Sequence, residues 1–369
     1  MPTSYTDRPP IPPTVWHARG RHVGSDAEDV LLRTLRERKG SGAVDDFREP
    51  SPEDDPAAAR VFEARWKAPG DVTVRARLAL APGSAGGREW TLIAEAEQPW
   101  DLAWPSPAAK FWPDDPDVPW DRDAATGLRM RGLNALPEDD KAVRRLLRDA
   151  ARHSWQIHVV VHEAMTPDHR GRVPLADRLP PGLRHRVVEH RAAPQQLRVV
   201  NWALQHHGVQ VPRGGAVLLP GTPGPADRDP ESLSVRSVFL DGSEPTELIA
   251  AVTAFAELPG PLPEGAEEAL TALREEWRLL TLEEELARER RLVAMYAEAL
   301  RAMTESRDLY REAAERANEA LAAYREAAAA GGAGAQPPAV PRVPSPLRGL
   351  TRTLERLKGT GAGPAKSGD

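Results

Sequence analysis

Cysteine is absent from this sequence of 369 residues. Its absence excludes disulfide bonds, thiolate nucleophiles and zinc or iron–sulfur sites with cysteine ligands. The chain also lacks a run of about 18 apolar residues, the length a membrane span needs. Residues 1 to 13 are polar and rich in proline, without the apolar core of a signal peptide. We therefore expect a cytoplasmic protein without a transmembrane segment, in which residues 1 to 13 are disordered.

Lysine is scarce as well, with six lysines against 43 arginines, the excess that a GC-rich genome produces, and the formal net charge is -6. A dedicated nucleic-acid-binding protein usually has a basic face and a high isoelectric point, so the charge argues against a nucleic-acid partner. The sequence also has no Walker motif, no Gly-x-Gly-x-x-Gly and no Gly-x-Ser-x-Gly. We therefore expect no cofactor and favour a non-enzymatic protein.

Alternating residues predict an antiparallel meander in a β-rich α+β subdomain, residues 14 to 135. Phe62, Ala64 and Trp66 share one face of the first strand, and residues 72 to 80 and 90 to 96 alternate in the same way. Turn residues separate the three runs, as expected of neighbouring antiparallel strands.

A helix is expected before the meander, over residues 26 to 39. Ser25 and Glu28 are spaced as in a capping box, and Gly40 follows the last helical residue. The prediction therefore has a defined start and a defined end.

An α/β subdomain is expected over residues 136 to 258. Short β-branched runs at residues 157 to 161 and 235 to 240 alternate with helical segments, which indicates at least one βαβ unit and a partly parallel sheet. The fold class is therefore α+β, a mixed body followed by a long helical coiled-coil arm. Whether residues 14 to 258 form one domain or two is left open.

Residues 264 to 330 are nearly free of proline and glycine and are expected to form a helical hairpin or a coiled coil. Thr281 and Glu284 form a second predicted capping box, which starts a long helix. From Leu282 onward, positions spaced alternately four and three residues apart are apolar except for Glu289 and Arg307, the pattern of a coiled coil. The predicted core residues are Leu282, Leu286, Val293, Tyr296, Leu300, Met303, Tyr310, Leu321 and Tyr324.

Length decides what this helix is expected to do. It would extend roughly 70 Å, more than a compact body can cover. We expect it to pair in a homo-oligomer or with a helical partner protein, and the alternative is packing along its own body. Small apolar residues beside the core, such as Ala299 and Ala313, favour a bundle or an antiparallel hairpin over a parallel dimer.

The C-terminal region is expected to contain a disordered linker at residues 331 to 346 and a disordered tail at residues 359 to 369. A basic amphipathic helix is predicted between them, at residues 347 to 358. Its apolar face is expected to dock on a partner or on an anionic membrane surface. The four docking residues are Leu347, Leu350, Leu354 and Leu357.

Histidines cluster in the second half of the body, and His158 and His162 are four residues apart. A helix would bring both to one metal, but the intervening valines favour a strand, in which four residues span about 13 Å. We therefore expect no metal site. Catalytic candidates in the α/β region are Asp241, Ser243, His162 and Glu189, although Ser243 is better explained as a helix cap.

Tryptophan is overrepresented among the aromatic residues, and Trp100, Trp104, Trp112 and Trp120 lie in a proline-rich loop, residues 99 to 125. The indoles either pack into the adjacent sheet and order a long connection, or form a ligand or partner surface. The first interpretation is favoured, and the second makes these four residues the candidate ligand surface.

The function hypothesis is a non-enzymatic adaptor or scaffold that self-associates or binds a partner through its coiled coil. One alternative is an enzyme or small-ligand binder with its site in the α/β body. A second alternative is binding of an anionic membrane surface or of nucleic acid through the basic tail helix.

Overall fold

The computed structural model describes residues 9–50, 59–83, 87–153, 155–162, 173–205, 216–219, 234–235, 245–258 and 260–329. By its contacts the chain divides into two compact units, Met1–Leu279 and Leu280–Asp369, and each is described by itself. We call the first unit the body. The predicted linker, tail helix and final tail lie outside the described residues. So do Leu347, Leu350, Leu354, Leu357, Asp241 and Ser243.

The first sheet of the body has six antiparallel strands in the order β2-β3-β4-β5-β1-β6. The strands are β1 (Val15–His22), β2 (Asp46–Arg48), β3 (Arg60–Ala68), β4 (Val72–Pro82), β5 (Arg88–Ala96) and β6 (Arg122–Asp123). β3, β4 and β5 are consecutive neighbours, which confirms the predicted meander. Phe62, Ala64 and Trp66 are buried in one core with Trp16 and Trp90, because all of them point to the same face of the sheet.

Two helices contribute to this first core, α1 (Ala27–Gly40) and α2 (Ala108–Phe111). The first lies one residue later than predicted, and its start lacks the predicted capping box. Asp26 occupies the N-cap position and makes no side-chain cap hydrogen bond within the described chain. Glu28 instead accepts a hydrogen bond from Arg60 on β3, with 3.1 Å between Nη2 and Oε1. A tertiary contact therefore replaces the local one.

The second sheet of the body has five strands in the order β11-β10-β8-β9-β7. They are β7 (Leu133–Ala135), β8 (Ile157–His162), β9 (Val187–Ala192), β10 (Ala216–Leu219) and β11 (Ser234–Val235). β9 runs parallel to both β7 and β8, whereas β10 is antiparallel to β8. β7, α3 (Asp140–His153) and β8 make a crossover over β9, which confirms the predicted βαβ unit and the partly parallel sheet.

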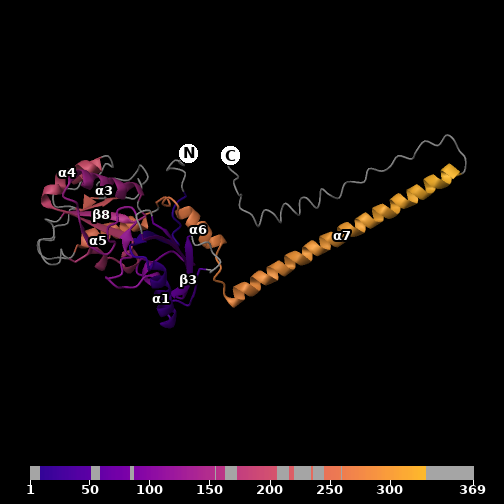
Figure 1. The fold of residues 1–369 in the computed structure, drawn as a ribbon, viewed down its shortest axis with the longest axis horizontal. Helices are drawn as coiled ribbons and strands as arrows, with labels where there is room; N and C mark the ends of the chain where they lie inside the picture. Colours follow the sequence, from indigo (N-terminus) through magenta and orange to yellow (C-terminus); the bar gives the residue numbers. More distant parts are fainter. Residues whose placement is uncertain are drawn as a thin grey trace. The chain divides into compact units, whose positions relative to one another are not determined.

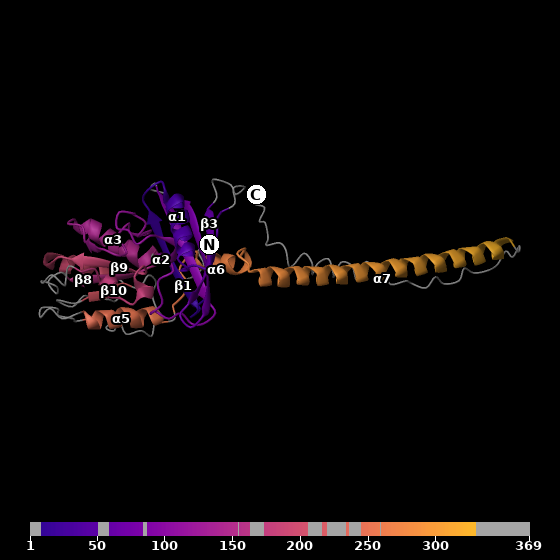
Figure 2. The ribbon, with the colours of Figure 1, turned by 90° about the horizontal axis from the view of Figure 1, so that it is seen from below.

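Helices cover both faces of the second sheet. Figures 1 and 2 show α3 on one face and α5 (Thr246–Glu257) on the other. α4 (Leu197–Leu204) packs beside α3. Among the described residues this half of the body also contains short 3-10 turns at Leu175–Asp177, Pro181–Leu183 and Pro194–Gln196.

The helix α6 (Ala266–Glu275) packs on β4 and β5 of the first sheet and belongs to the body. The residues after it are fixed by Glu63, whose Oε2 accepts backbone N–H groups of Arg278 at 3.0 Å and of Leu279 at 2.9 Å. The expected arm included this region from residue 264, but the division between the units falls after Leu279. Glu63 is consequently buried although it lies on the polar face of its strand.

The second unit contains α7 (Leu282–Ala329), a helix of 48 residues. Its predicted capping box is present, because Thr281 Oγ1 accepts the N–H of Glu284 at 3.0 Å and Glu284 Oε2 accepts the N–H of Thr281 at 2.8 Å. No residue of α7, all of which the structure describes, is buried. Within the described chain, no helix has both the length and the apolar character that crossing a membrane requires.

Candidate functional site

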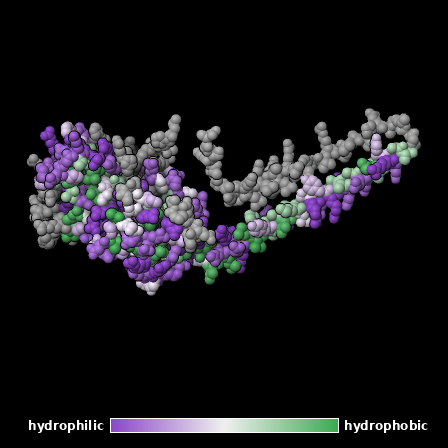
Figure 3. All heavy atoms as spheres, viewed as in Figure 1, coloured by the Kyte–Doolittle hydropathy of each residue, from purple (hydrophilic) through white to green (hydrophobic). Residues whose placement is uncertain are grey.

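The long helix α7 carries an apolar face that is exposed within the part of the chain that the structure describes. We call the large apolar residues at its core positions the seam. Figure 3 shows hydrophobic and hydrophilic residues along this helix. Exposed fractions in the seam range from 45% at Tyr310 to 84% at Leu282. The members of the seam are Leu282, Leu286, Val293, Tyr296, Leu300, Met303, Tyr310, Leu321 and Tyr324.

Charged residues outside the seam stabilise the helix locally. Arg311 lies 3.9 Å from Glu315, and Arg316 lies 3.6 Å from Glu312, each pair one helical turn apart. Such exposed pairs contribute about 0.3–0.5 kcal/mol each. Burying one large apolar side chain contributes about 1.5–3 kcal/mol. Burying the seam would therefore stabilise α7 more than these exposed ion pairs do.

The heptad pattern of the seam is interrupted at two positions, Glu289 and Arg307. Arg307 donates hydrogen bonds to its neighbour Asp308, at 3.1 Å from Nε and 3.0 Å from Nη2. Alanines such as Ala299 and Ala313 flank the seam and widen its apolar face. The whole face suits close packing against another helix, because small flanking residues reduce the distance between helix axes.

The four tryptophans considered as a ligand surface lie mainly inside the body. Trp104, Trp112 and Trp120 are buried, and Trp100 is half-buried. Trp112 stacks on Trp120 and on His22, each with 5.6 Å between ring centres, and Trp90 lies 6.1 Å away. Trp120 Nε1 donates to the carbonyl of Pro113 at 2.9 Å. These contacts favour the interpretation in which the indoles order the loop by packing.

His162 and Glu189, two of the four catalytic candidates, point to opposite faces of the second sheet. His162 pairs with Ala192 and Glu189 with Val159, so an odd number of residues separates them along the strands. Glu189 accepts the N–H of Leu175 at 2.8 Å. Burial raises the pKa of Glu189. Neither ring nitrogen of His162 has a hydrogen-bond partner within the part of the chain that the structure describes.

A buried polar cluster that the sequence did not predict joins the two sheets. His158 Nδ1 and His190 Nε2 are 2.8 Å apart, and Asp123 of the first sheet lies 3.9 Å from His158 Nε2. Thr126 Oγ1 donates to Asp123 Oδ2 at 2.6 Å. Burial lowers the pKa of His158 to about 3, lowers the pKa of His190 well below its usual value, and raises the pKa of Asp123. Both histidines are therefore neutral at physiological pH.

Access limits what this cluster can do chemically. His158, His190 and Asp123 are each 0% exposed, so a solute cannot reach them. Among the described residues, no group of three or more His, Asp or Glu side chains is arranged to hold a metal ion. The cluster acts as a polar contact between the sheets. Histidine clustering was visible in the sequence, but Asp123 is distant in the chain and carried no signal.

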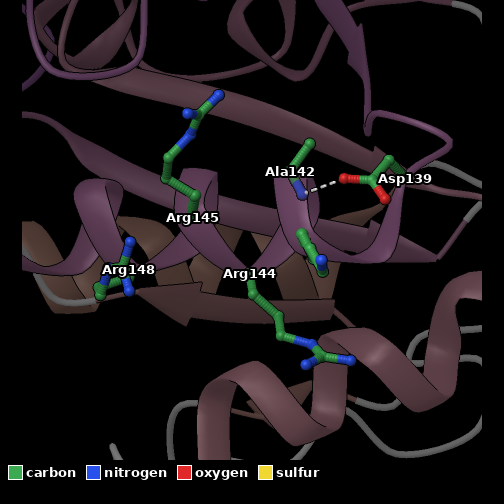
Figure 4. Close-up of a pocket in the computed structure, with 6 residues that line it drawn as sticks. Asp139, Ala142, Arg144, Arg145 and Arg148 are labelled. Carbon is green, nitrogen blue, oxygen red and sulfur yellow. Dashed lines mark hydrogen bonds between the residues drawn. The ribbon is translucent and has the colours of Figure 1, made fainter.

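A shallow pocket of about 420 Å³ lies on the exposed face of α3, and four cations line it. They are Lys141, Arg144, Arg145 and Arg148. Figure 4 shows Arg144 and Arg145 leaving α3 in different directions. Asp139 Oδ2 accepts the N–H of Ala142 at 2.8 Å and so occupies the start of the helix (Figure 4).

The cations of this pocket are partly compensated by neighbouring groups. Arg144 lies 4.9 Å from the ring centre of Trp202, which is exposed on α4, and 4.0 Å from Asp140. Arg148 lies 3.9 Å from Asp149. Exposed guanidinium groups around one hollow can bind an anion, and the stacking on Trp202 holds one of them in place.

Comparison with known proteins yields no relative. The chain matches no protein-family model, no curated protein and no solved structure. Its functional interpretation therefore rests on the seam, the polar cluster and the basic pocket themselves.

Proposed function

We propose that the protein is a non-enzymatic scaffold that self-associates through α7 and so brings copies of its body together. The observation that carries the proposal is the seam: nine large apolar side chains at heptad spacing, each at least 45% exposed. The body buries side chains of the same types in two cores of its own. Exposed apolar surface on this scale marks an interaction site.

The energetics support association rather than an isolated helix. A single helix in water gains little from propensity and surface ion pairs, and most helical stability in proteins comes from packing of an apolar face. Pairing two copies of α7 would bury seam residues of both helices in one event. The helix is long enough for several heptads of knobs-into-holes packing, which is what a stable two-stranded coiled coil requires.

Substitution of the seam tests the proposal. Leu300→Asp places a charge in the centre of the paired segment and is expected to convert the associated protein into a monomer. The matched control is Glu305→Ala, a charge removed from the opposite side of the same helix. Sedimentation velocity at micromolar concentration measures the mass, and circular dichroism checks that the body is folded. An unchanged mass for Leu300→Asp, or a monomeric parent protein, would contradict self-association.

A second candidate function is binding of a small polyanion at the basic pocket of α3, which sharpens the alternative of a small-ligand site in the α/β body. The supporting observation is that four cations, Lys141, Arg144, Arg145 and Arg148, line one hollow. Inorganic triphosphate is a suitable probe, because its charge and size match such a hollow and its binding should weaken as salt is added.

Charge reversal tests this second candidate. Arg145→Glu is expected to weaken triphosphate binding in a calorimetric titration at low ionic strength. Arg198→Glu is the matched control, because Arg198 is exposed on α4 but does not line the pocket. Equal losses in both variants, or no heat of binding in the parent protein, would exclude a defined anion site.

A further inference from the structure

Two charged residues interrupt the core pattern of α7, and their places constrain how two helices can pair. Every core position from Leu282 to Ala328 other than Glu289 and Arg307 is apolar. The two lie roughly 27 Å apart along one helix, at about 1.5 Å per residue, so they cannot pair within one copy. A charge inside a helix interface is costly unless an opposite charge meets it.

A parallel pair would bring like charges together. In that arrangement each core residue faces the same residue of the other helix. Glu289 would face Glu289 of the second copy, and Arg307 would face Arg307 of the second copy. One attractive contact would form at the rim, between Glu285 and Arg290 of the second copy, but exposed rim pairs contribute little. Two repulsive core layers outweigh it.

An antiparallel pair removes the like-charge contacts at both Glu289 and Arg307. The two core positions of each heptad are called a and d, and d follows a by three residues. In an antiparallel pair the a positions of one helix face the d positions of the other. Counted from Leu282 as a d position, Arg307 is an a position and Glu289 is a d position. When the twofold axis passes beside residue 298, Glu289 of each copy faces Arg307 of the other. The same two residues that repel in a parallel pair then form two ion pairs.

The other core positions between residues 282 and 314 agree with this register. Opposite residues around the axis are apolar, and on the rim Glu283 falls beside Arg311 of the second copy. Near the axis Ala299 of each copy lies beside the same residue of the other, which lets the helices approach closely. The apolar layers pair Leu282 with Ala314, Leu286 with Tyr310, Val293 with Met303 and Tyr296 with Leu300.

We infer that the part of the seam from Leu282 to Tyr310 is occupied by α7 of a second copy of this chain, antiparallel, with Glu289 of each copy opposite Arg307 of the other. This inference rests on the proposed self-association and adds its orientation and register. The paired segment covers residues 282 to 314 of each copy. Residues 315 to 329, with the seam residues Leu321 and Tyr324, lie beyond it. Charge complementarity selects this register, because neighbouring antiparallel registers leave Glu289 and Arg307 opposite apolar residues.

Disulfide cross-linking tests the register directly, because the chain has no native cysteine. Val293→Cys and Met303→Cys are made as two separate proteins of different tag length, mixed and oxidised. Residues 293 and 303 are opposite in the inferred register, so the mixture is expected to give the disulfide-linked heterodimer, whereas neither protein alone links to itself. A mixture of Val293→Cys with Tyr310→Cys is the matched control and is expected to stay unlinked.

Each other outcome overturns something specific. Self-linking of Val293→Cys alone would show a parallel pair, and linking of the Val293→Cys and Tyr310→Cys mixture would show another antiparallel register; both contradict the inference and leave self-association standing. A monomeric mass for the unmodified full chain would contradict self-association itself.

Charge reversal provides an independent test of the ion pairs. Glu289→Arg replaces each attractive layer by a repulsive one and is expected to raise the dimer dissociation constant about tenfold or more, the change produced by about 1.4 kcal/mol. The double variant Glu289→Arg with Arg307→Glu restores opposite charges and is expected to recover most of the affinity. In a parallel pair all three proteins keep like-charged layers, so equal affinities would overturn the inference.

Discussion

The body and α7 use the same apolar residue types and treat them in opposite ways. In the body Trp16, Trp90 and Leu92 are fully buried between a sheet and its covering helices. In α7 Leu282, Tyr296 and their neighbours at heptad spacing stay exposed. The body therefore buries its apolar residues in cores of its own, whereas the apolar face of α7 is exposed within the described chain.

Deleting residues 280 to 369 is expected to separate the two regions functionally, and this is the largest effect. The truncated chain should be a monomer at all micromolar concentrations, while its cooperative unfolding should match that of the body in the full chain. The cut follows Leu279 because α6 and the segment fixed by Glu63 belong to the body. Light scattering and denaturant unfolding measure the two properties. Persistent association of the truncated chain would place the interface in the body.

Two aromatic substitutions should distinguish the role of the body in stability from the role of α7 in association. Trp112→Ala removes a fully buried indole and is expected to lower the free energy of unfolding of the body by about 3–5 kcal/mol. Tyr296→Ala, in the seam, should leave the unfolding of the body unchanged and weaken association. Urea unfolding followed by tryptophan fluorescence measures the first effect, and sedimentation the second. A loss of body stability in Tyr296→Ala, or weakened association in Trp112→Ala with a stable body, would contradict this separation of roles.

Acidification is expected to destabilise the body before it affects α7. Burial lowers the pKa of His158 and His185 to about 3, and the pKa values of His17 and His190 are also lowered. Below pH 6.5 these histidines bind protons in the unfolded chain but stay neutral in the folded body. Their contribution to the free energy of unfolding is therefore complete above pH 6.5 and falls as the pH drops below it.

The expected loss is about 1–2 kcal/mol per histidine between pH 6.5 and pH 5. The raised pKa values of Asp123 and Glu189 act in the opposite direction, because these carboxyl groups take up protons while folded. Four histidines outweigh two carboxyl groups. Urea midpoints at pH 7.5, 6.5 and 5.5 measure the net change, and a rising midpoint on acidification would show that the histidines are protonated in the folded body.

Glycine substitutions test how tightly the body is packed, with a smaller effect. A Cβ at Gly20 would lie 2.4 Å from Cζ2 of Trp90, whereas one at Gly40 would meet no described atom within 4 Å. Gly20→Ala is expected to lower the free energy of unfolding by about 1–3 kcal/mol. Gly40→Ala should be neutral or slightly stabilising. Equal effects in thermal unfolding would argue against the packing of β1 on Trp90.

The two predicted capping boxes offer the smallest contrast. Thr281→Ala removes a formed cap and is expected to cost about 1 kcal/mol at the start of α7. Ser25→Ala should change stability by less than about 0.5 kcal/mol, because the helix it precedes has no side-chain cap in the described chain. Amide hydrogen exchange in the first turn of each helix distinguishes the two. Faster exchange after Ser25→Ala would contradict the assigned cap.

Local patterns in the sequence predicted the elements that depend on local order. The alternation around Phe62 predicted the meander, and the Thr281 and Glu284 box forms as expected. The Ser25 and Glu28 box does not, because Arg60 on a strand distant in sequence competes for the same carboxylate. Propensity alone cannot reveal such a competitor.

Long-range contacts were beyond the sequence. Nothing in the pattern of α6 distinguishes a helix that packs on β5 from one that pairs with α7, since both need an apolar face. The contact of Asp123 with His158 joins two sheets, and its partners are set by topology. The long helix, in contrast, follows from a local pattern and is confirmed, and the role of its heptad positions as a packing core stays a prediction.

The molar mass of the full chain in solution tests the central claim most directly. Sedimentation equilibrium over a micromolar concentration series should give twice the chain mass of 40.3 kDa, with dissociation toward the single mass on dilution. A mass of 40.3 kDa at every concentration would contradict self-association through α7.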